Sequence, residues 1–313
     1  MARKTAFLFP GQGSQFVGMG QALVERFPAV APIFEETDRV CQKPITRLCF
    51  EGPISELTLT ENCQPAITAV SLACLFVLNE SGIRSSVCAG HSVGECASMV
   101  SAGIINEKDA LRLVHKRSAL MHREALANPG SMAAVIGLDM AEVLEIVDKA
   151  KEGEILDVAN HNTSRQIVIT GQKDPVDRAV ALAKEKKGKA IPLKVSGAWH
   201  SGLMKGGVDE FRAFMDDIQF SPPRSEMIFN ATAQPETDPE RIKNIMANQL
   251  VSPVKWYDTM RKMLDDGVDT FVEVGPKNVL AGLLKKVASP EDAISVFTVQ
   301  DPESLESMLE KIS

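Results

Sequence analysis

The chain alternates between short runs of apolar residues and longer stretches whose apolar residues recur every three or four positions. Short apolar runs bounded by turn residues predict buried strands, and the longer spacing predicts helices packed along one face. The predicted strands are residues 5–9, 87–89, 227–230 and 270–274. The predicted helices are residues 19–26, 65–80, 93–100, 107–127, 208–217, 241–250, 256–266 and 279–287, with Asn106 as the N-cap of the longest. This alternation predicts a mostly parallel sheet covered on both faces.

Residues 131–195 follow a different order of elements. Strands are predicted at 132–138, 156–160, 166–170 and 190–195, and helices at 141–151 and 175–187. The order β-α-β-β-α-β is that of ferredoxin-like domains. Gly130 and Gly197 border the segment as candidate hinges. We therefore expect a ferredoxin-like insertion subdomain at 128–196 within a main domain formed by 1–127 and 197–313.

Composition narrows the class of protein. The chain has 313 residues, of which 44% are hydrophobic and 24% charged, as in ordinary soluble domains. Its net charge of −7 and its three Trp and Tyr residues argue against nucleic-acid binding. The longest apolar stretch, 66–78, is shorter than the roughly 20 residues of a membrane span. The apolar run near the N-terminus, 6–9, is too short for a signal peptide. We expect a cytoplasmic protein without a membrane partner.

All six cysteines lie between positions 41 and 96, and none has a Cys-x-x-Cys or zinc-like spacing. We interpret them as reduced thiols and expect neither a metal nor a redox cofactor. Cys96 lies one helical turn beyond Ser92, where the expected role is that of a small buried apolar residue.

Candidate chemistry centres on Gly90-His91-Ser92-Val93-Gly94, which stands between a predicted strand and a predicted helix. In that context Gly-x-Ser-x-Gly is typical of the nucleophile elbow of α/β-hydrolase-like folds, in which a strained turn exposes the serine hydroxyl at a helix start. The backbone N–H of Val93 would supply one oxyanion donor. The loop Gly11-Gln12-Gly13 after the first strand is a candidate for the second, because glycine permits close approach to the substrate.

A serine nucleophile needs a base, and the chain has five histidines. His91 adjoins Ser92, so we expect its ring to point away from the serine oxygen. His115 and His122 lie on the long helix, and His161 lies in the predicted insertion. His200 lies in a loop with glycines at positions 197 and 202 that re-enters the main domain, which makes it the first candidate.

Arg117 lies beside an apolar stripe on the long helix formed by Leu113, Val114, Leu120 and Met121. Such an arginine is commonly a surface residue whose stem covers the stripe. If it is buried near the site, we expect it to bind a carboxylate through both arms of the guanidinium.

Five ordered motifs make the resemblance specific. They are Phe9-Pro10-Gly11-Gln12-Gly13-Ser14-Gln15, Gly90-His91-Ser92-Val93-Gly94-Glu95, Lys116-Arg117-Ser118-Ala119-Leu120-Met121, Ser196-Gly197-Ala198-Trp199-His200 and Glu273-Val274-Gly275-Pro276. Together they resemble the malonyl-CoA:acyl carrier protein transacylases, of the free-standing type of bacterial fatty-acid synthesis, over nearly the whole chain. One departure is Trp199, where the family usually has Phe.

The resemblance implies a role for each matching residue. Ser92 would carry the malonyl group, His200 would act as base and then acid, and the backbone carbonyl of Gln249 would orient His200. The N–H groups of Gln12 and Val93 would form the oxyanion hole, and Arg117 would bind the malonyl carboxylate. The further substrate-binding residues would be Gln64, His91, Asn160 and Asn162.

The implied partners are malonyl-CoA, as a substrate, and an acyl carrier protein. Carrier proteins of this kind are acidic, so Lys184, Lys186, Lys187 and Lys189 form a candidate docking surface, although an ordinary solvated helix face has the same composition. Two alternatives share the chemistry: an acyltransferase acting in trans on a polyketide synthase, and a malonate decarboxylase component. A serine thioesterase is a third, disfavoured by Arg117. We expect a monomer.

Overall fold

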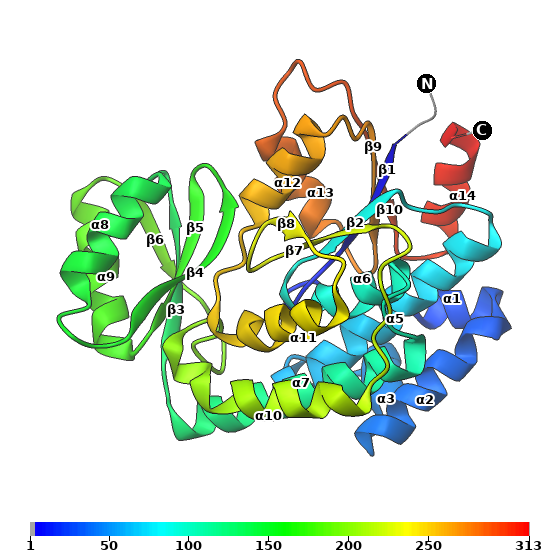
Figure 1. Ribbon diagram of the computed structural model, residues 1–313, viewed down its shortest axis with the longest axis horizontal. Helices are drawn as coiled ribbons and strands as arrows, with labels where there is room; N and C mark the ends of the chain where they lie inside the picture. The colour runs from blue at the N-terminus through cyan, green and yellow to red at the C-terminus, as the bar shows by residue number, and fades with distance from the viewer. Residues whose placement is uncertain (1–3, 313) are drawn as a thin grey trace.

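A computed structural model describes residues 4–312 and contains two separate sheets (Figure 1). The larger sheet has six strands in the order β10-β9-β1-β2-β7-β8. Their bounds are β1 Thr5–Phe9, β2 Val87–Gly90, β7 Glu226–Phe229, β8 Gln234–Pro235, β9 Thr270–Val274 and β10 Ser295–Val299. All neighbours pair in parallel except β7 and β8. The α/β fold with a mostly parallel sheet is thus confirmed.

The central strands β1, β2 and β9 of this sheet are buried on both faces, as their apolar runs predict. In β1, Phe7 and Phe9 face one core, while Ala6 and Leu8 face a second core on the other side. The first core includes α5 (Thr60–Glu80), α6 (Glu95–Ser101) and α7 (Glu107–Ala127). The second is closed by α12 (Trp256–Asp265) and α13 (Val279–Val287). Helices packed on both faces of β1 and β2 fix the positions of the carboxyl ends of these two strands.

Helix α5 corrects one expectation from the sequence. It begins at Thr60, includes Pro65 and runs for 21 residues, so it is longer than the apolar stretch 66–78 suggests. By length and composition it could cross a membrane, yet 89% of its apolar window is buried within the fold. It packs against α2, α3, α6 and α7, and we interpret it as the central helix of the first core.

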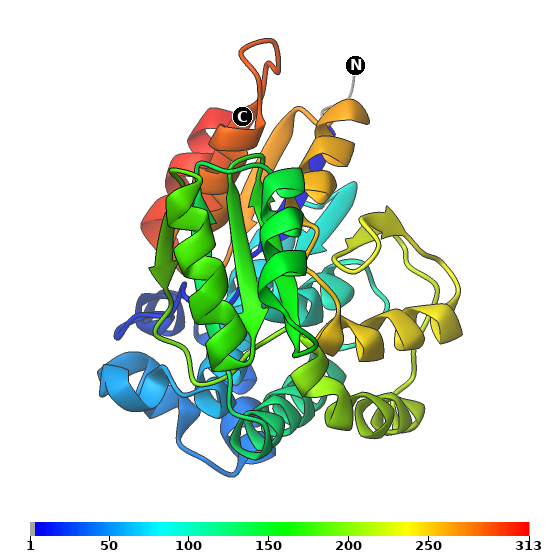
Figure 2. The same ribbon diagram turned by 90° about the vertical axis from the view of Figure 1, so that its left-hand side faces the viewer.

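The second sheet lies in residues 131–192, here termed the insert, and all of its strands pair antiparallel in the order β4-β5-β3-β6. The strands are β3 Ser131–Ile136, β4 Leu156–Thr163, β5 Gln166–Gly171 and β6 Lys189–Pro192. The two helices of the insert, α8 (Met140–Ala150) and α9 (Lys173–Glu185), cover its outer face (Figure 2). This is the ferredoxin-like arrangement, with a core of its own built from aliphatic side chains.

The insert is tied to the rest of the chain, termed the body, by backbone hydrogen bonds. The His161 N–H donates to the Val254 carbonyl at 2.9 Å, and the Val254 N–H donates to the Ala159 carbonyl at 2.8 Å. These bonds join β4 to the segment that enters α12. They place Asn160 beside the body, where it lines the cavity described below.

The remaining helices of the body include some that the sequence predicted and some that it did not. They are α1 Gln21–Arg26, α2 Ala31–Cys41, α3 Ile45–Glu51, α4 Ile54–Leu57, α10 Val208–Phe214, α11 Pro239–Asn248 and α14 Pro302–Ile312, with short 3-10 helices at Pro28–Val30, Ser92–Gly94, Gly202–Gly207, Met215–Asp217 and Gln249–Val251. Of these, α2, α3, α4 and α14 were missed, as were β8 and β10. The helix predicted at 93–100 begins instead as a 3-10 turn at Ser92 and becomes α-helical only at Glu95.

Candidate active site

Ser92 stands on the turn between β2 and the short helix that leads into α6, and its φ of 53° lies in the left-handed region. The turn is tight because Gly90 and Gly94 come into backbone contact. A Cβ on Gly90 would lie 1.9 Å from the Gly94 carbonyl carbon, and one on Gly94 would lie 2.1 Å from the Phe9 carbonyl oxygen. The structure therefore has the nucleophile elbow that the motif predicts.

His200 reaches Ser92 from the loop that returns from the insert. Its Nε2 lies 2.8 Å from the Ser92 Oγ, and its Nδ1 lies 2.9 Å from the Gln249 backbone carbonyl oxygen. A carbonyl can only accept, so Nδ1 carries the hydrogen and Nε2 accepts from the serine hydroxyl. Like Ser92, His200 has a left-handed φ, here 61°, which is typical of backbone strain held at a functional site.

Two effects keep the His200 imidazole neutral. Burial and, less strongly, the nearby positive charge of Arg117 lower the pKa of His200 to about 3. The neutral ring is the form that can accept a proton from Ser92. The arrangement is a Ser–His pair oriented by a backbone carbonyl, with no carboxylate in hydrogen-bond contact with the ring among residues 4–312.

Arg117 is fully buried on α7 and points at the nucleophile. Its Nη2 donates to the Ser92 Oγ at 3.1 Å. Its Nε and Nη2 donate to the Gln249 side-chain oxygen at 3.2 and 2.7 Å, and its Nη1 donates to the Gln64 side-chain oxygen at 2.6 Å. Within the chain its hydrogen-bond acceptors are amide oxygens and the serine hydroxyl, so the carboxylate expected for Arg117 would have to come from the substrate. Amides leave the charge of Arg117 without direct neutralisation, and so available to an anionic acyl group.

A cavity of about 120 Å³ opens beside Ser92. The predicted site residues that line it are Gln12, Gln64, His91, Ser92, Asn160 and His200. Its remaining walls are apolar apart from the Trp199 indole: Met121, Met132, Leu193, Val195 and Trp199. The side chains of the insert and of the body thus share one cavity, although their segments lie far apart in the sequence.

His91, which lines the cavity, forms a hydrogen-bonded pair with Asn162. The His91 Nε2 lies 3.0 Å from the Asn162 Oδ1, and the His91 ring packs edge-on against Trp256 with the centroids 5.3 Å apart. His91 makes its hydrogen bond to Asn162 rather than to Ser92, although it lines the same cavity. Burial lowers the pKa of His91, so its ring is neutral and donates to the amide oxygen.

Two residues of the site were missed in the sequence, Glu95 and Asn230. Both are fully buried behind Ser92, where the Ser92 N–H donates to the Asn230 Oδ1 at 2.7 Å. A Glu directly after the elbow and an Asn at the end of a predicted strand were visible in the sequence. Nothing in the sequence shows that β7 lies next to β2, which brings the two residues together.

Comparison with known proteins agrees with this geometry. Residues 6–300 match the acyl transferase domain family. The chain is 41% identical over 311 residues to the malonyl CoA-acyl carrier protein transacylase of Bacillus subtilis (strain 168), covering 99% of this chain and 97% of the relative. The chain belongs to the malonyl CoA-acyl carrier protein transacylase family. It is an acyltransferase.

Solved structures show the same relationship. An acyl carrier protein S-malonyltransferase from Vibrio cholerae O1 biovar eltor superposes with a TM-score of 0.93 at 38% identity, over 97% of this chain and 99% of that one. A malonyl-transacylase solved in complex with a type II polyketide acyl-carrier protein also has a TM-score of 0.93, at 35% identity, over 98% of this chain and 99% of that one.

The six cysteines of the enzyme are all buried and form no disulfide. Cys88 and Cys96 each lie four positions from the nucleophile along the chain, and Cys96 is on the first turn of α6. Burial raises the pKa of the Cys96 thiol to about 12. Among the described residues, no group of three or more His, Cys, Asp or Glu side chains is arranged to hold a metal ion.

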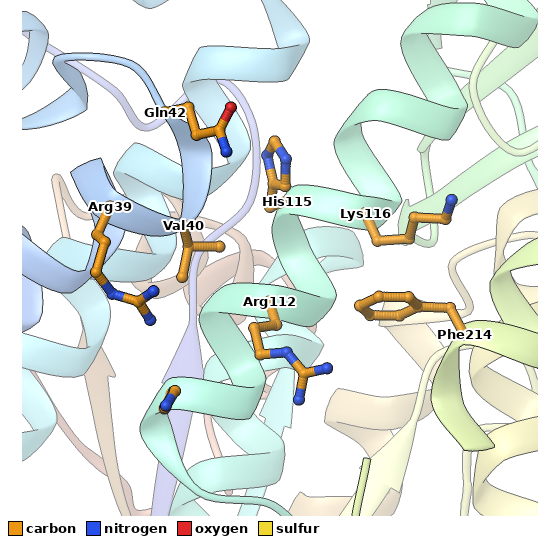
Figure 3. Close-up of a pocket in the computed structure, with 8 residues that line it drawn as sticks. Arg39, Val40, Gln42, Arg112, His115, Lys116 and Phe214 are labelled. Carbon is orange, nitrogen blue, oxygen red and sulfur yellow. The ribbon is translucent and has the colours of Figure 1, made fainter. Parts of the chain in front are cut away.

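A second, larger hollow of about 480 Å³ lies on another face of α7, against α2 and α10 (Figure 3). Arg39, Arg112, His115, Lys116 and Phe214 line it, together with Val40, Gln42 and Lys108. It shares no residue with the cavity at Ser92, and no Ser, Thr or Cys lines it. The larger hollow therefore offers no hydroxyl or thiol nucleophile, whereas the smaller cavity contains Ser92.

Proposed function

We propose that the enzyme transfers the malonyl group of malonyl-CoA to the phosphopantetheine thiol of an acyl carrier protein, through a malonyl ester of Ser92. The observation that carries the proposal is the buried Arg117 guanidinium 3.1 Å from the Ser92 Oγ. A buried cation beside the nucleophile favours an acyl group with a free carboxylate, because a neutral acyl group leaves the charge unpaired.

The first half of the reaction acylates the enzyme. The Ser92 Oγ attacks the thioester carbonyl as the His200 Nε2 takes the hydroxyl proton. The C–S bond then breaks, and the coenzyme A sulfur leaves with the proton that His200 returns. The backbone N–H groups of Gln12 and Val93 stabilise the oxyanion in this scheme, and Gln12 lines the cavity as that role requires.

The second half reverses these steps with a different thiol. The carrier thiol gives its proton to His200 and attacks the Ser92 ester, and Ser92 Oγ leaves with the proton restored. Asn160 and Asn162 are suited to contact the thioester arm, since both are amides on β4, Asn160 lines the cavity and Asn162 lies in hydrogen-bond contact with His91, which lines it too. The kinetics are of the ping-pong type, and no metal or redox group takes part in this scheme.

We further propose that this chemistry supplies malonyl units to fatty-acid synthesis in the cytoplasm, with the enzyme acting as a monomer. Service to a polyketide carrier is the second candidate, because a similar structure was solved with such a carrier. Initial rates of transfer from malonyl-CoA to purified carriers of the two kinds compare them directly. A higher kcat/KM for the fatty-acid carrier supports the first, and a higher value for the polyketide carrier supports the second.

Intact-protein mass spectrometry tests the central step. Wild type mixed with malonyl-CoA is expected to gain one malonyl group, with little acetyl adduct from acetyl-CoA. Ser92→Ala is expected to show no adduct, whereas the exposed Ser55→Ala control keeps it. Release of free malonate without an adduct would mean a hydrolase, and an adduct that survives in Ser92→Ala would place the nucleophile elsewhere.

A further inference from the structure

Glu95 is a buried carboxylate that the scheme above does not use. It is the first residue of α6 and has no exposed surface. One carboxylate oxygen accepts from the Asn230 backbone N–H at 2.6 Å, and the other accepts from the Gln249 side-chain N–H. Burying a charged group is costly, so a carboxylate kept here calls for a reason.

Its two partners hold the nucleophile from both sides. The Asn230 side chain accepts from the Ser92 N–H at 2.7 Å and donates to the Gly90 carbonyl at 2.6 Å. The Gln249 Nε2 donates to the Ser92 carbonyl at 2.9 Å. Glu95 therefore joins the two residues that brace the strained turn around Ser92.

The Gln249 amide connects this brace to Arg117. Its oxygen accepts from the Arg117 Nε and Nη2, while its nitrogen faces Glu95. An amide has one donor end and one acceptor end, and an ionised carboxylate can only accept. Glu95, together with the Ser92 carbonyl, thus favours the orientation in which the amide oxygen faces Arg117. A rotated amide would point N–H groups at the guanidinium, and two donors would oppose each other.

We propose that Glu95 is a positioning residue that, as an ionised carboxylate, orients the Gln249 side chain so that Arg117 is aimed at the acyl group. Glu95 acts through Gln249 and touches neither substrate. The proposal rests on the proposed function, since it assigns to Glu95 part of the preference for a carboxylate-bearing acyl group.

The charge state of Glu95 matters for this role. Burial raises the pKa of Glu95 to about 7, against the opposing effects of its two hydrogen bonds and of Arg117. Besides Arg117, Glu95 interacts with the Cys96 thiol, which is uncharged near pH 7. Below this pKa the carboxyl group of Glu95 is protonated, and its O–H faces either the Asn230 N–H or the Gln249 side-chain N–H. Two donors then oppose each other at that oxygen. The orienting effect on Gln249 is then lost as pH falls through about 7.

The chain offers a matched control in Glu273. It is equally buried, burial raises its pKa to about 7 as well, and its oxygens accept from the Leu280 and Ala281 N–H groups at the start of α13. It has no hydrogen bond to Ser92, Gln249 or Arg117. Glu273→Gln therefore makes the same chemical change at a buried helix start without touching the site.

The experiment compares Glu95→Gln with Glu273→Gln and wild type. The readout is the ratio of kcat/KM for malonyl-CoA to that for acetyl-CoA, with melting temperature measured alongside. In Glu95→Gln the ratio is expected to fall about tenfold or more, mainly through malonyl-CoA, because Arg117 loses its orientation. Glu273→Gln is expected to keep the wild-type ratio even where its melting temperature drops. A folded Glu95→Gln with the wild-type ratio overturns the proposal.

A second measurement uses wild type alone, so it tests the proposal even where Glu95→Gln does not fold. The same ratio is followed in wild type from pH 8 to pH 5.5. The contribution of His200 is common to both substrates and cancels. The ratio is expected to fall as Glu95 takes up its proton, and a constant ratio overturns the proposal. Wild type with no malonyl preference at pH 8 would instead refute the proposed function, so the two failures are distinguishable.

Discussion

The body and the insert line one cavity with different kinds of side chain. The body contributes Ser92 and His200 to its lining and Arg117 to the site behind it, each held by hydrogen bonds to other buried groups. The insert contributes Met132 and Asn160 to the lining, and its Asn162 contacts His91; none of these three side chains of the insert carries a charge. In the proposed mechanism the body thus supplies proton transfer and charge recognition as well as most of the apolar wall, whereas the insert supplies only neutral side chains.

The interiors of the body and of the insert also differ in how many polar side chains they bury beside one another. The body buries Glu95, Arg117 and Gln249 next to one another, a network in which each donor has a fixed acceptor. The core of the insert is aliphatic, and its ion pairs, such as Lys149 with Glu145, lie on the surface. A buried polar network permits little rearrangement, whereas an apolar wall can adjust. Changes in the body should therefore alter the reaction by much larger factors than changes in the insert.

The largest effect is expected for His200→Ala, which removes the base. Acylation of Ser92 should slow by about 10³-fold or more, since general acid–base catalysis contributes factors of that size. Stopped-flow release of coenzyme A from malonyl-CoA measures this step. His122→Ala, on α7 but outside the lining of the cavity, should keep the wild-type rate. A loss of only a few-fold in His200→Ala would remove it from the mechanism.

Arg117→Ala should come next and should depend on the acyl group. The kcat/KM for malonyl-CoA is expected to fall by about 10²-fold or more, because a buried charge pair with the substrate is lost. Transfer from acetyl-CoA should change far less. Arg117→Lys should not restore the malonyl rate, because an ammonium cannot reproduce the fork of donors. Arg112→Ala, on the same helix but facing the hollow of Figure 3, is the control. Equal losses for both substrates would contradict a role in selectivity.

A variant of the insert should have a modest effect. In Asn162→Ala, His91 loses its partner and the contact proposed for the thioester arm is absent. The KM for malonyl-CoA should rise by about three- to tenfold, the size expected for one neutral hydrogen bond, with kcat little changed. The exposed Asn248→Ala serves as control. A hundredfold loss of kcat would show that the insert takes part in the chemistry itself.

The smallest effect is expected at the exposed lysines that follow α9. Lys186→Glu/Lys187→Glu should raise the KM for carrier protein by about threefold, since surface charges mainly steer association. The KM for malonyl-CoA should not change. Lys149→Glu/Lys151→Glu, at the end of α8 in the same insert, gives the matched charge change. If both pairs leave the KM for the carrier unchanged, docking takes place elsewhere.

Much of this architecture can be read from local patterns. Strand β1 and helix α13 have the bounds that the apolar pattern predicts, and Asn106 caps α7 by accepting from the Asp109 N–H. The order of elements in the insert predicts its fold. The Gly-x-Ser-x-Gly turn needs only local sequence, because its glycines make the close contacts. Together with the family resemblance, these patterns locate Ser92, His200 and Arg117.

The missed parts depend on information that is not local. Strand β10 is a half-exposed edge strand, so it lacks a buried apolar run. Helix α14 did carry a signal, since Asp301 precedes Pro302 and accepts from the Ser304 N–H, a helix start that the sequence allows one to recognise. Gln249, which Arg117 contacts, and Asn230, which Glu95 contacts, each lie more than 130 residues away from their partner along the chain. Only the folded sheet brings these together.

The burial of Cys96 has a consequence for where the acyl group can go. The enzyme takes acyl groups from one thiol and gives them to another, so any reactive thiol of its own would compete for them. The thiolate is the attacking form, and with a pKa of about 12 Cys96 is almost never ionised at neutral pH. An acyl group carried on Ser92, as proposed, should therefore not move to this neighbouring side chain and be stranded there. The same property should protect the resting enzyme from alkylating reagents and peroxide.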